Sequence, residues 1–273
     1  VSGGNNTAIG NNALTVLTSG TQNTAIGSAS SDAITTGSSN TAVGRLSLSS
    51  NISGNQNTAI GKQALEDNTG SNNTAVGDRS GSENTSGTQN TFLGAVSGRF
   101  NTTASNNTGI GYNSLGANTT GAENVAVGSL SLDANTTGTP NTAIGYNSLT
   151  TNTTGGSNTG LGKSSLQNNT TASHNTAVGN NCLLANTTGA NNTAVGSLAL
   201  DANTTGSSNV AVGRSALSAN TTGASNVAVG HQSLEANTEG SNNTAVGIQA
   251  LDANTTPSNM TAVGTAALGA NTT

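Results

Sequence analysis

Apolar residues recur along this chain at a fixed interval instead of gathering in long runs. The string Asn6-Thr-Ala-Ile-Gly10 returns at Asn23 to Gly27 and, with Val in place of Ile, at Asn40 to Gly44. The interval is 17 residues, except for one of 16 residues between Gly61 and Gly77. Such a fixed period is the sequence signature of a repeat architecture. The glycine of this string occupies Gly10, Gly27, Gly44, Gly61, Gly77, Gly94, Gly111, Gly128, Gly145, Gly162, Gly179, Gly196, Gly213, Gly230, Gly247 and Gly264.

The repeat predicts an all-β fold. A 17-residue unit is too short for two packed helices, and its Thr, Val, Asn and Gly residues disfavour helix. We therefore expect a parallel β-solenoid of sixteen coils, one per repeat, with strands stacked in register about 4.8 Å apart. Residues 1–273 are expected to form a single solenoid domain.

Alternation along the strand suggests which residues face the core. The residue before the invariant glycine is always Val, Ile or Leu, so we expect it to point inward. The Thr two residues earlier, replaced by Val125, Val210 and Val227 in three coils, is expected to be partly buried. The expected inward residues are Ile9, Val43, Leu93, Val127, Leu161, Val195, Val229 and Val263, with Leu14, Leu65, Leu115, Leu132, Leu200, Leu234 and Leu251 from the second half of the coil. The expected outward residues are alanines, among them Ala8, Ala59, Ala126, Ala143, Ala194 and Ala211.

One irregular coil tests this assignment. Gly98 stands where most coils have the leucine, and Phe100 follows two residues later. Because residues two apart share a face of a strand, Phe100 is expected to fill the volume that the missing leucine leaves.

Asparagine recurs in two further columns. One precedes the strand, as at Asn6 and Asn243, and is broken only by Met260; the other opens the Asn-Thr-Thr triplets, as at Asn118. Stacked amides can form hydrogen-bonded ladders, so both columns are interpreted as structural. The Asn-Thr-Thr triplets also match the N-glycosylation sequon, and the sequence leaves open whether they are modified. The glycine after the triplet, as at Gly121, Gly138 and Gly206, is expected to adopt a positive φ angle.

Composition excludes several protein classes. Hydrophobic residues make up 31% of the chain, aromatic residues 1% and charged residues 6%, which argues against an ordinary globular core. Disordered chains are usually rich in proline and in charged residues, whereas this chain has only two prolines and a net charge of -5, so its composition also argues against disorder. Without a basic patch or a long apolar run, we expect neither nucleic-acid binding nor membrane insertion.

No catalytic constellation is visible, and we expect no enzyme activity, cofactor or metal site. His174 and His231 lie in variable positions of different coils and have no matching partners. Cys182 occupies a position that is otherwise Ala or Ser, so we expect it to be a small buried residue. An acid recurs at one position without the pattern of calcium-binding solenoids. These acids are Asp133, Asp201, Glu235 and Asp252.

Two strings resemble known repeat families. Asn124-Val-Ala-Val-Gly128 resembles the Asn-Ser-Val-Ala-Ile-Gly signature of trimeric autotransporter adhesin heads. Asn141-Thr-Ala-Ile-Gly-Tyr-Asn-Ser-Leu149, followed by Asn152-Thr-Thr-Gly155, is similar to the repeat regions of phage-type tail-fibre proteins. The first resemblance implies a left-handed β-roll in which three chains lie side by side on a bacterial surface.

We therefore expect a structural or adhesive fibre segment, either a fibre shaft or an adhesin head, located extracellularly, on a cell surface or on a virion. Its expected partners are further copies of itself, as a homotrimer through the small alanines or as an end-to-end filament, and a cell-surface or glycan receptor. Since the repeat is in phase at both ends, we also expect the fibre to continue beyond them. The alternative is an ice-binding solenoid that uses its Thr and Asn ladders. The first Thr column argues against this alternative, because it alternates with a Val that we expect to point inward.

Overall fold

The computed structural model describes residues 3–272, which form sixteen three-residue strands and no helix, and therefore no helix that could cross a membrane. The chain divides into two compact units, residues 1–139 and 140–273. The first unit contains β1 (Thr7–Ile9), β2 (Thr24–Ile26), β3 (Thr41–Val43), β4 (Thr58–Ile60), β5 (Thr74–Val76), β6 (Thr91–Leu93), β7 (Thr108–Ile110) and β8 (Val125–Val127). The second contains β9 (Thr142–Ile144), β10 (Thr159–Leu161), β11 (Thr176–Val178), β12 (Thr193–Val195), β13 (Val210–Val212), β14 (Val227–Val229), β15 (Thr244–Val246) and β16 (Thr261–Val263).

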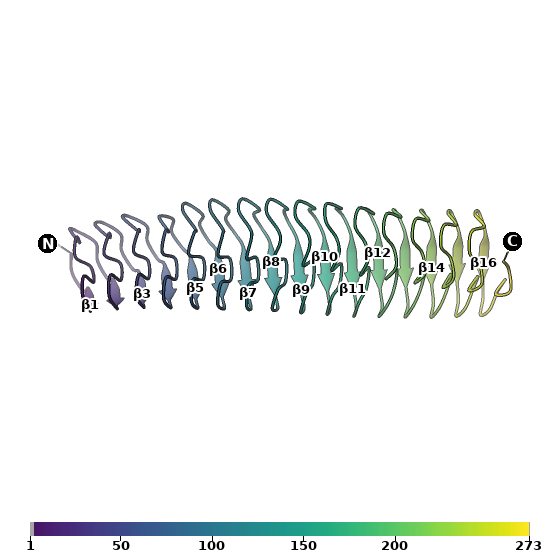
Figure 1. The fold of residues 1–273 in the computed structure, drawn as a ribbon, viewed down its shortest axis with the longest axis horizontal. Coiled ribbons are helices and arrows are strands. Elements are labelled where there is room, and N and C mark those ends of the chain that lie inside the picture. The colour runs from purple at the N-terminus through teal and green to yellow at the C-terminus, as the bar shows by residue number, and fades with distance from the viewer. Residues whose placement is uncertain (1–2, 273) are drawn as a thin grey trace. The chain divides into compact units, whose positions relative to one another are not determined.

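Within each unit the strands pair in the order of the chain, and every pair is parallel (Figure 1). Equivalent residues of successive repeats lie side by side, as Ala25 does with Ala42. The 16-residue interval keeps this register, because Thr58 pairs with Thr74. The predicted parallel β-solenoid with one coil per repeat is confirmed, and the invariant glycines form one column in each unit.

The two faces of the strand are the reverse of our prediction. The central alanines are fully buried, for example Ala126 and Ala194. The Val, Ile or Leu before the glycine points outward, so that Val195 is 37% exposed and Val127 and Val229 are half-buried. The interior of each coil is narrow, because the strand faces a column of Ser or Ala residues and the leucine that directly follows it in most coils, as Leu132 follows Ser131. In coils that contain this leucine, the central strand residue is no larger than alanine. The two walls lie close enough for the Ser97 hydroxyl to donate a hydrogen bond across the interior to the Gly109 carbonyl at 3.0 Å.

The predicted leucine column is confirmed as the largest component of the core. Leu132, Leu200 and Leu234 are fully buried. Each adopts a left-handed backbone conformation, with φ between 51° and 55°. This conformation is uncommon for a residue with a side chain, and here it turns the leucine into the coil.

Phe100 is not the aromatic residue that fills the irregular coil. Its side chain is 38% exposed and lies beside the Arg99 guanidinium, 4.6 Å from the ring centroid. Phe92, which replaces the central alanine of β6, is fully buried instead. The prediction was wrong because residues 98 and 100 lie in the turn that follows β6, so the alternation of a strand does not apply to them. Residue 92, in contrast, is on the inner side of its strand.

The two glycine columns serve different purposes. The invariant glycines have φ between 127° and 143°, a region that residues with a Cβ scarcely enter. Gly121, Gly138 and Gly206 do not have the positive φ that we predicted. At Gly121 a Cβ atom would come within 2.6 Å of Asn118 Oδ1 and 2.5 Å of the Gly138 carbonyl oxygen. Adjacent coils therefore stack closely at this second column, where most coils have glycine and only the small residues Ala104, Ala172 and Pro257 replace it.

Both asparagine columns form the predicted ladders. Asn203 Nδ2 donates hydrogen bonds to Asn186 Oδ1 at 2.9 Å and to the Gly206 carbonyl at 3.0 Å. In the other column, Asn226 donates from its backbone amide to Asn209 Oδ1 at 2.9 Å. These buried amides satisfy the backbone of the turns, as buried polar groups require.

Candidate functional site

The most extensive candidate surface is the outer face of the sheet. It carries two parallel columns of side chains, which we call the outer stripe: the residue before each invariant glycine, and the Thr or Val two positions earlier. In the first unit Ile60 is 39% exposed and Ile110 38%; in the second, Leu161 is 43% exposed and Val246 37%. Apolar side chains thus line the solvent side of every described strand.

Nothing charged interrupts the outer stripe. The residues of its two columns are Thr, Val, Ile or Leu in all sixteen strands. Most are β-branched, and such side chains have few rotamers in a strand. Because the strands pair in register, each unit presents methyl and hydroxyl groups at a regular spacing of about 4.8 Å along the stacking direction.

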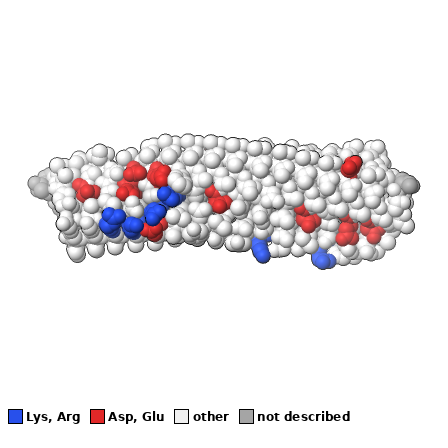
Figure 2. Space-filling model, viewed as in Figure 1, with Lys and Arg blue, Asp and Glu red and all other residues white. Residues whose placement is uncertain are grey.

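Charged side chains lie elsewhere, and many gather in the first unit (Figure 2). A polar hollow of about 470 Å³ is lined there by three acids and two arginines. Arg79 Nε lies 3.6 Å from Asp78, and Arg99 Nε lies 3.8 Å from Glu83. Ion pairs this exposed contribute little to stability. The lining residues are Gln63, Glu66, Asp67, Arg79, Ser82, Glu83 and Arg99.

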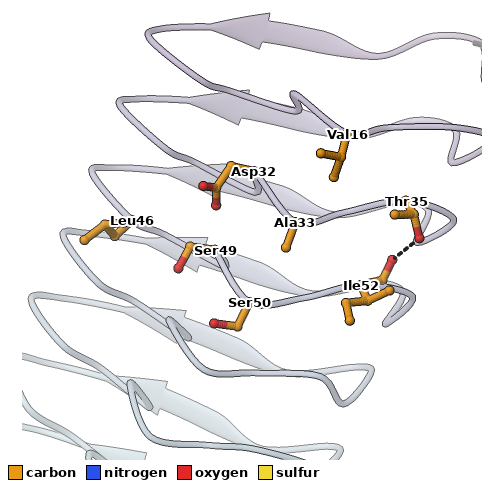
Figure 3. A pocket seen from close by; sticks show the side chains of 8 residues that line it. All are labelled: Val16, Asp32, Ala33, Thr35, Leu46, Ser49, Ser50 and Ile52. Carbon is orange, nitrogen blue, oxygen red and sulfur yellow. Dashed lines mark hydrogen bonds between the residues drawn. The ribbon is translucent and has the colours of Figure 1, made fainter.

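A second hollow, of about 590 Å³, lies over the first coils and is largely apolar (Figure 3). Val16 and Ile52 depart from the repeat consensus here and are 48% and 55% exposed. The Thr35 hydroxyl donates to the Ile52 carbonyl at 3.2 Å and closes one side. The hollow therefore results from local substitutions in the turn, away from the outer stripe. Its lining is Val16, Asp32, Ala33, Thr35, Leu46, Ser49, Ser50 and Ile52.

The residues that sequence analysis considered for chemistry remain apart. Within residues 3–272 no group of three or more His, Cys, Asp or Glu side chains could hold a metal ion. His231 Nε2 lies 3.2 Å from Arg214 Nη1 on an exposed surface, and His174 is exposed in another coil. Burial raises the pKa of the Asp133 and Asp201 carboxyl groups above their usual range. Glu235 and Asp252 lie half-buried in the same column.

Cys182 is buried, as predicted for the small position that it occupies. Its thiol donates to the Ala194 carbonyl at 3.2 Å, as the serine hydroxyls of other coils do. Burial raises the pKa of the Cys182 thiol to about 12. A protonated, inaccessible thiol is a poor nucleophile, so this cysteine packs the core.

Sequence reasoning missed the outer stripe because it placed the same residues inside. The signal was present in the composition of the alanine column, which is Ala or Gly in every strand except β6. An outward column has no reason to exclude large side chains so consistently. No protein-family profile matches this chain, and no curated protein and no solved structure matches it either.

Proposed function

We propose that this protein is a structural segment of an extracellular fibre and that copies of it associate side by side through the outer stripe. The observation that carries the proposal is the uninterrupted, uncharged apolar column on the outer face. Monomeric soluble proteins rarely leave contiguous apolar patches of more than a few hundred Å² in water, and larger ones mark interaction surfaces.

A second copy of the chain fits this surface for a geometric reason. Two parallel copies have the same coil spacing, so a contact made at one coil repeats at the next within a unit. Many weak apolar contacts then add together, at about 25 cal/mol per Å² of apolar surface buried. We propose a parallel homotrimer, in which three stripes meet along a common axis. The resemblance of the repeat at Asn124 to Gly128 to trimeric adhesin heads supports this choice over a pair.

The resemblances also support the cellular setting. Both similar families are surface fibres, so we propose a location on a cell surface or a virion. In this setting the association is structural, the chain is not an enzyme, and the loops that face away from the stripe are free to meet a receptor, such as a glycan.

The oligomeric state tests the proposal directly. Lysine at Val195 and Val212, two adjacent positions of the stripe, places like charges between the copies and should convert the assembly into monomers. Lysine at Thr188 and Thr205, which are exposed in the triplet turns of adjacent coils, is the matched control and should leave the assembly intact. Light scattering and sedimentation measure the mass. A wild-type chain that is a monodisperse monomer would contradict the proposal.

One observation favours ice binding as a second candidate. Thr and Val or Ile share the outer face, so the argument that an inward Val counts against ice binding no longer applies. Stiff hydroxyl and methyl groups then repeat at about 4.8 Å between strands and at twice the residue rise, about 6.6 Å, along them. Such a surface could order water into a lattice if it were open to solvent.

Ice binding and self-association make opposite demands on the stripe. Thermal hysteresis and the shaping of ice crystals measure ice binding. If the chain is a monomer that binds ice, the wild type should show both activities, and lysine at Val195 and Val212 should abolish them. An assembled wild type without either activity supports the fibre.

A further inference from the structure

The asparagines of the Asn-Thr-Thr column match a glycosylation motif in the sequence, but they are buried in the folded chain. Each Asn-Thr-Thr triplet from Asn101 to Asn254, and the related strings at Asn51 and Asn84, is an N-glycosylation sequon, Asn-X-Ser/Thr. In the folded chain, however, these asparagines are ladder residues with exposed fractions of 0 or 1%. The buried sequon asparagines are Asn51, Asn84, Asn101, Asn118, Asn135, Asn152, Asn169, Asn186, Asn203, Asn220 and Asn254.

The nitrogen that would carry a glycan is already fully used. An asparagine Nδ2 has two hydrogens. Asn203 uses one toward Asn186 Oδ1 at 2.9 Å and the other toward the Gly206 carbonyl at 3.0 Å. Asn220 repeats the pattern, toward Asn203 at 2.8 Å and Gly223 at 3.0 Å. A sugar on Nδ2 would remove one of these bonds and would have no path to solvent.

The transfer reaction shows what such a modification would cost. Nδ2 forms a bond to the anomeric carbon of a lipid-diphosphate-linked oligosaccharide, loses one proton, and the lipid diphosphate leaves. The product has a single Nδ2 hydrogen and a bulky polar substituent. Neither the coil-to-coil bond nor the close stacking at Gly206 can coexist with it, since even a Cβ atom on that glycine would overlap the next coil.

A second set of sequons in the same chain lacks this conflict. It lies in the turn just before the strand, where the asparagine side chain is exposed and a glycan would point into solvent. The third residue of each is a Thr of the outer stripe. These asparagines are Asn5, Asn72, Asn106, Asn191, Asn242 and Asn259. One more exposed sequon, Asn168-Asn169-Thr170, lies beside the buried column and is counted with the exposed set in the experiment below.

We propose that N-glycan transfer and folding of this chain are mutually exclusive at the Asn-Thr-Thr column. Transfer to the unfolded chain traps it unfolded, whereas folding withdraws the column from any transferase. The protein therefore acquires its fold out of reach of N-glycan transfer, whatever its final location. This inference is independent of the proposed function.

The experiment sends the chain, with a cleavable signal peptide, through the secretory pathway of a eukaryotic cell. Three samples are compared: wild type, wild type with an inhibitor of lipid-linked oligosaccharide synthesis, and a variant without the buried sequons. In that variant the third residue of each buried sequon becomes Ala, as in Thr120→Ala and Thr205→Ala. These side chains are exposed, so the ladder is untouched. Mass spectrometry locates the glycans, and circular dichroism with protease resistance measures folding.

We expect untreated wild type to carry glycans on the column and to be protease-sensitive. The inhibitor should restore the folded form, and the variant should fold while carrying glycans only on the exposed set. A matched control removes the exposed set through Thr7→Val, Thr74→Val, Thr108→Val, Thr193→Val, Thr244→Val and Thr261→Val, changes that the Val125, Val210 and Val227 coils already tolerate, and removes the Asn168 sequon through Asn168→Gln. This control should still misfold without inhibitor. Untreated wild type that resists protease, with or without glycans on the column, overturns the inference.

Discussion

The ring of Phe92 occupies the space that a side chain at Gly98 would need. A Cβ atom on Gly98 would overlap three carbons of the ring. The ring also reaches the preceding coil, where a Cβ on Gly81 would lie 2.9 Å from Phe92 Cδ2. Two adjacent coils therefore lack a leucine, and one phenylalanine from the opposite wall of the interior fills both vacancies.

This relationship predicts a compensating pair of substitutions. Phe92→Ala should lower the free energy of unfolding by about 3–5 kcal/mol, because it empties two positions at once. Gly98→Leu alone should also destabilise, since the new side chain collides with the ring. The double variant should recover part of the loss, because φ at Gly98 is 58°, close to the 53° of Leu115. Denaturant unfolding measures all three.

Phe100→Ala is the control for this cycle. Its ring is partly exposed, so we expect a change within about 0.5 kcal/mol. A cost at Phe100 as large as that at Phe92 would contradict the partly exposed placement of Phe100.

The inward alanine column predicts a strict limit on size. Ala211→Leu places three carbons into an interior that is filled by neighbouring alanines, and should destabilise by about 1–3 kcal/mol or more. Val212→Thr, one residue along and on the outer face, should change the stability of the isolated subunit little. Thermal unfolding under conditions that dissociate the assembly compares the two. The reverse order of effects would place Val212 in the core.

The asparagine ladder predicts that losing one of its side chains lowers the stability of the fold through lost hydrogen bonds, not through lost packing volume. Asn203→Ala removes the donor to Asn186 Oδ1 and the acceptor that Asn220 uses. A buried polar group without a partner costs about 1–3 kcal/mol, so the loss should exceed that of an ordinary surface substitution. Thr205→Ala, exposed in the same turn, is the control and should be close to neutral. Equal effects of the two substitutions would mean that the ladder adds no stability.

Asp201 predicts a pH dependence with a definite sign. Burial raises the pKa of its carboxyl group in the folded state from the ordinary value of 3.8, so the folded chain holds the proton longer than the unfolded chain. Stability from this group is then greatest below the unfolded pKa and falls as pH rises through the folded pKa. Asp201→Asn should match the wild type near pH 3 and exceed it in stability at pH 7.

Asp133→Asn serves as an independent replicate, because burial raises the pKa of that carboxyl as well. Unfolding curves at several pH values should show the same trend for both variants. A wild-type advantage at pH 7 would indicate that the ionised carboxylate stabilises the fold.

The reactivity of the Cys182 thiol should report on opening of the second unit. Its thiol is buried and its pKa is about 12, so a thiol reagent at pH 8 should react only when the coil opens. The labelling rate should rise steeply with denaturant. Cys182→Ser should fold normally, since Ser148 and Ser165 occupy the equivalent position in other coils. Rapid labelling under native conditions would contradict the buried placement.

Much of the fold could be predicted from the sequence, because the repeat determines the structure within one coil and the residues that meet between successive coils. The period set the position of every strand, the glycine column marked the turn that follows it, and the recurrence of Asn118 and Asn203 in identical surroundings indicated ladders. Leu132 and Leu234 are buried, as expected. Each of these conclusions depends only on equivalent residues meeting their equivalents in the next coil.

The candidate site could not be predicted, because it depends on a choice that the repeat leaves open. Side chains alternate between the two faces of a strand, so the sequence spacing is the same whether Val195 or Ala194 faces the core. Preference for large apolar residues in a core favoured Val195 inside. The width of the closed coil decided otherwise: the turn brings Ser or Ala and Leu so close to the strand that only Ala fits opposite them. The sequence by itself determined the solenoid and its ladders, whereas tertiary packing determined which columns face water.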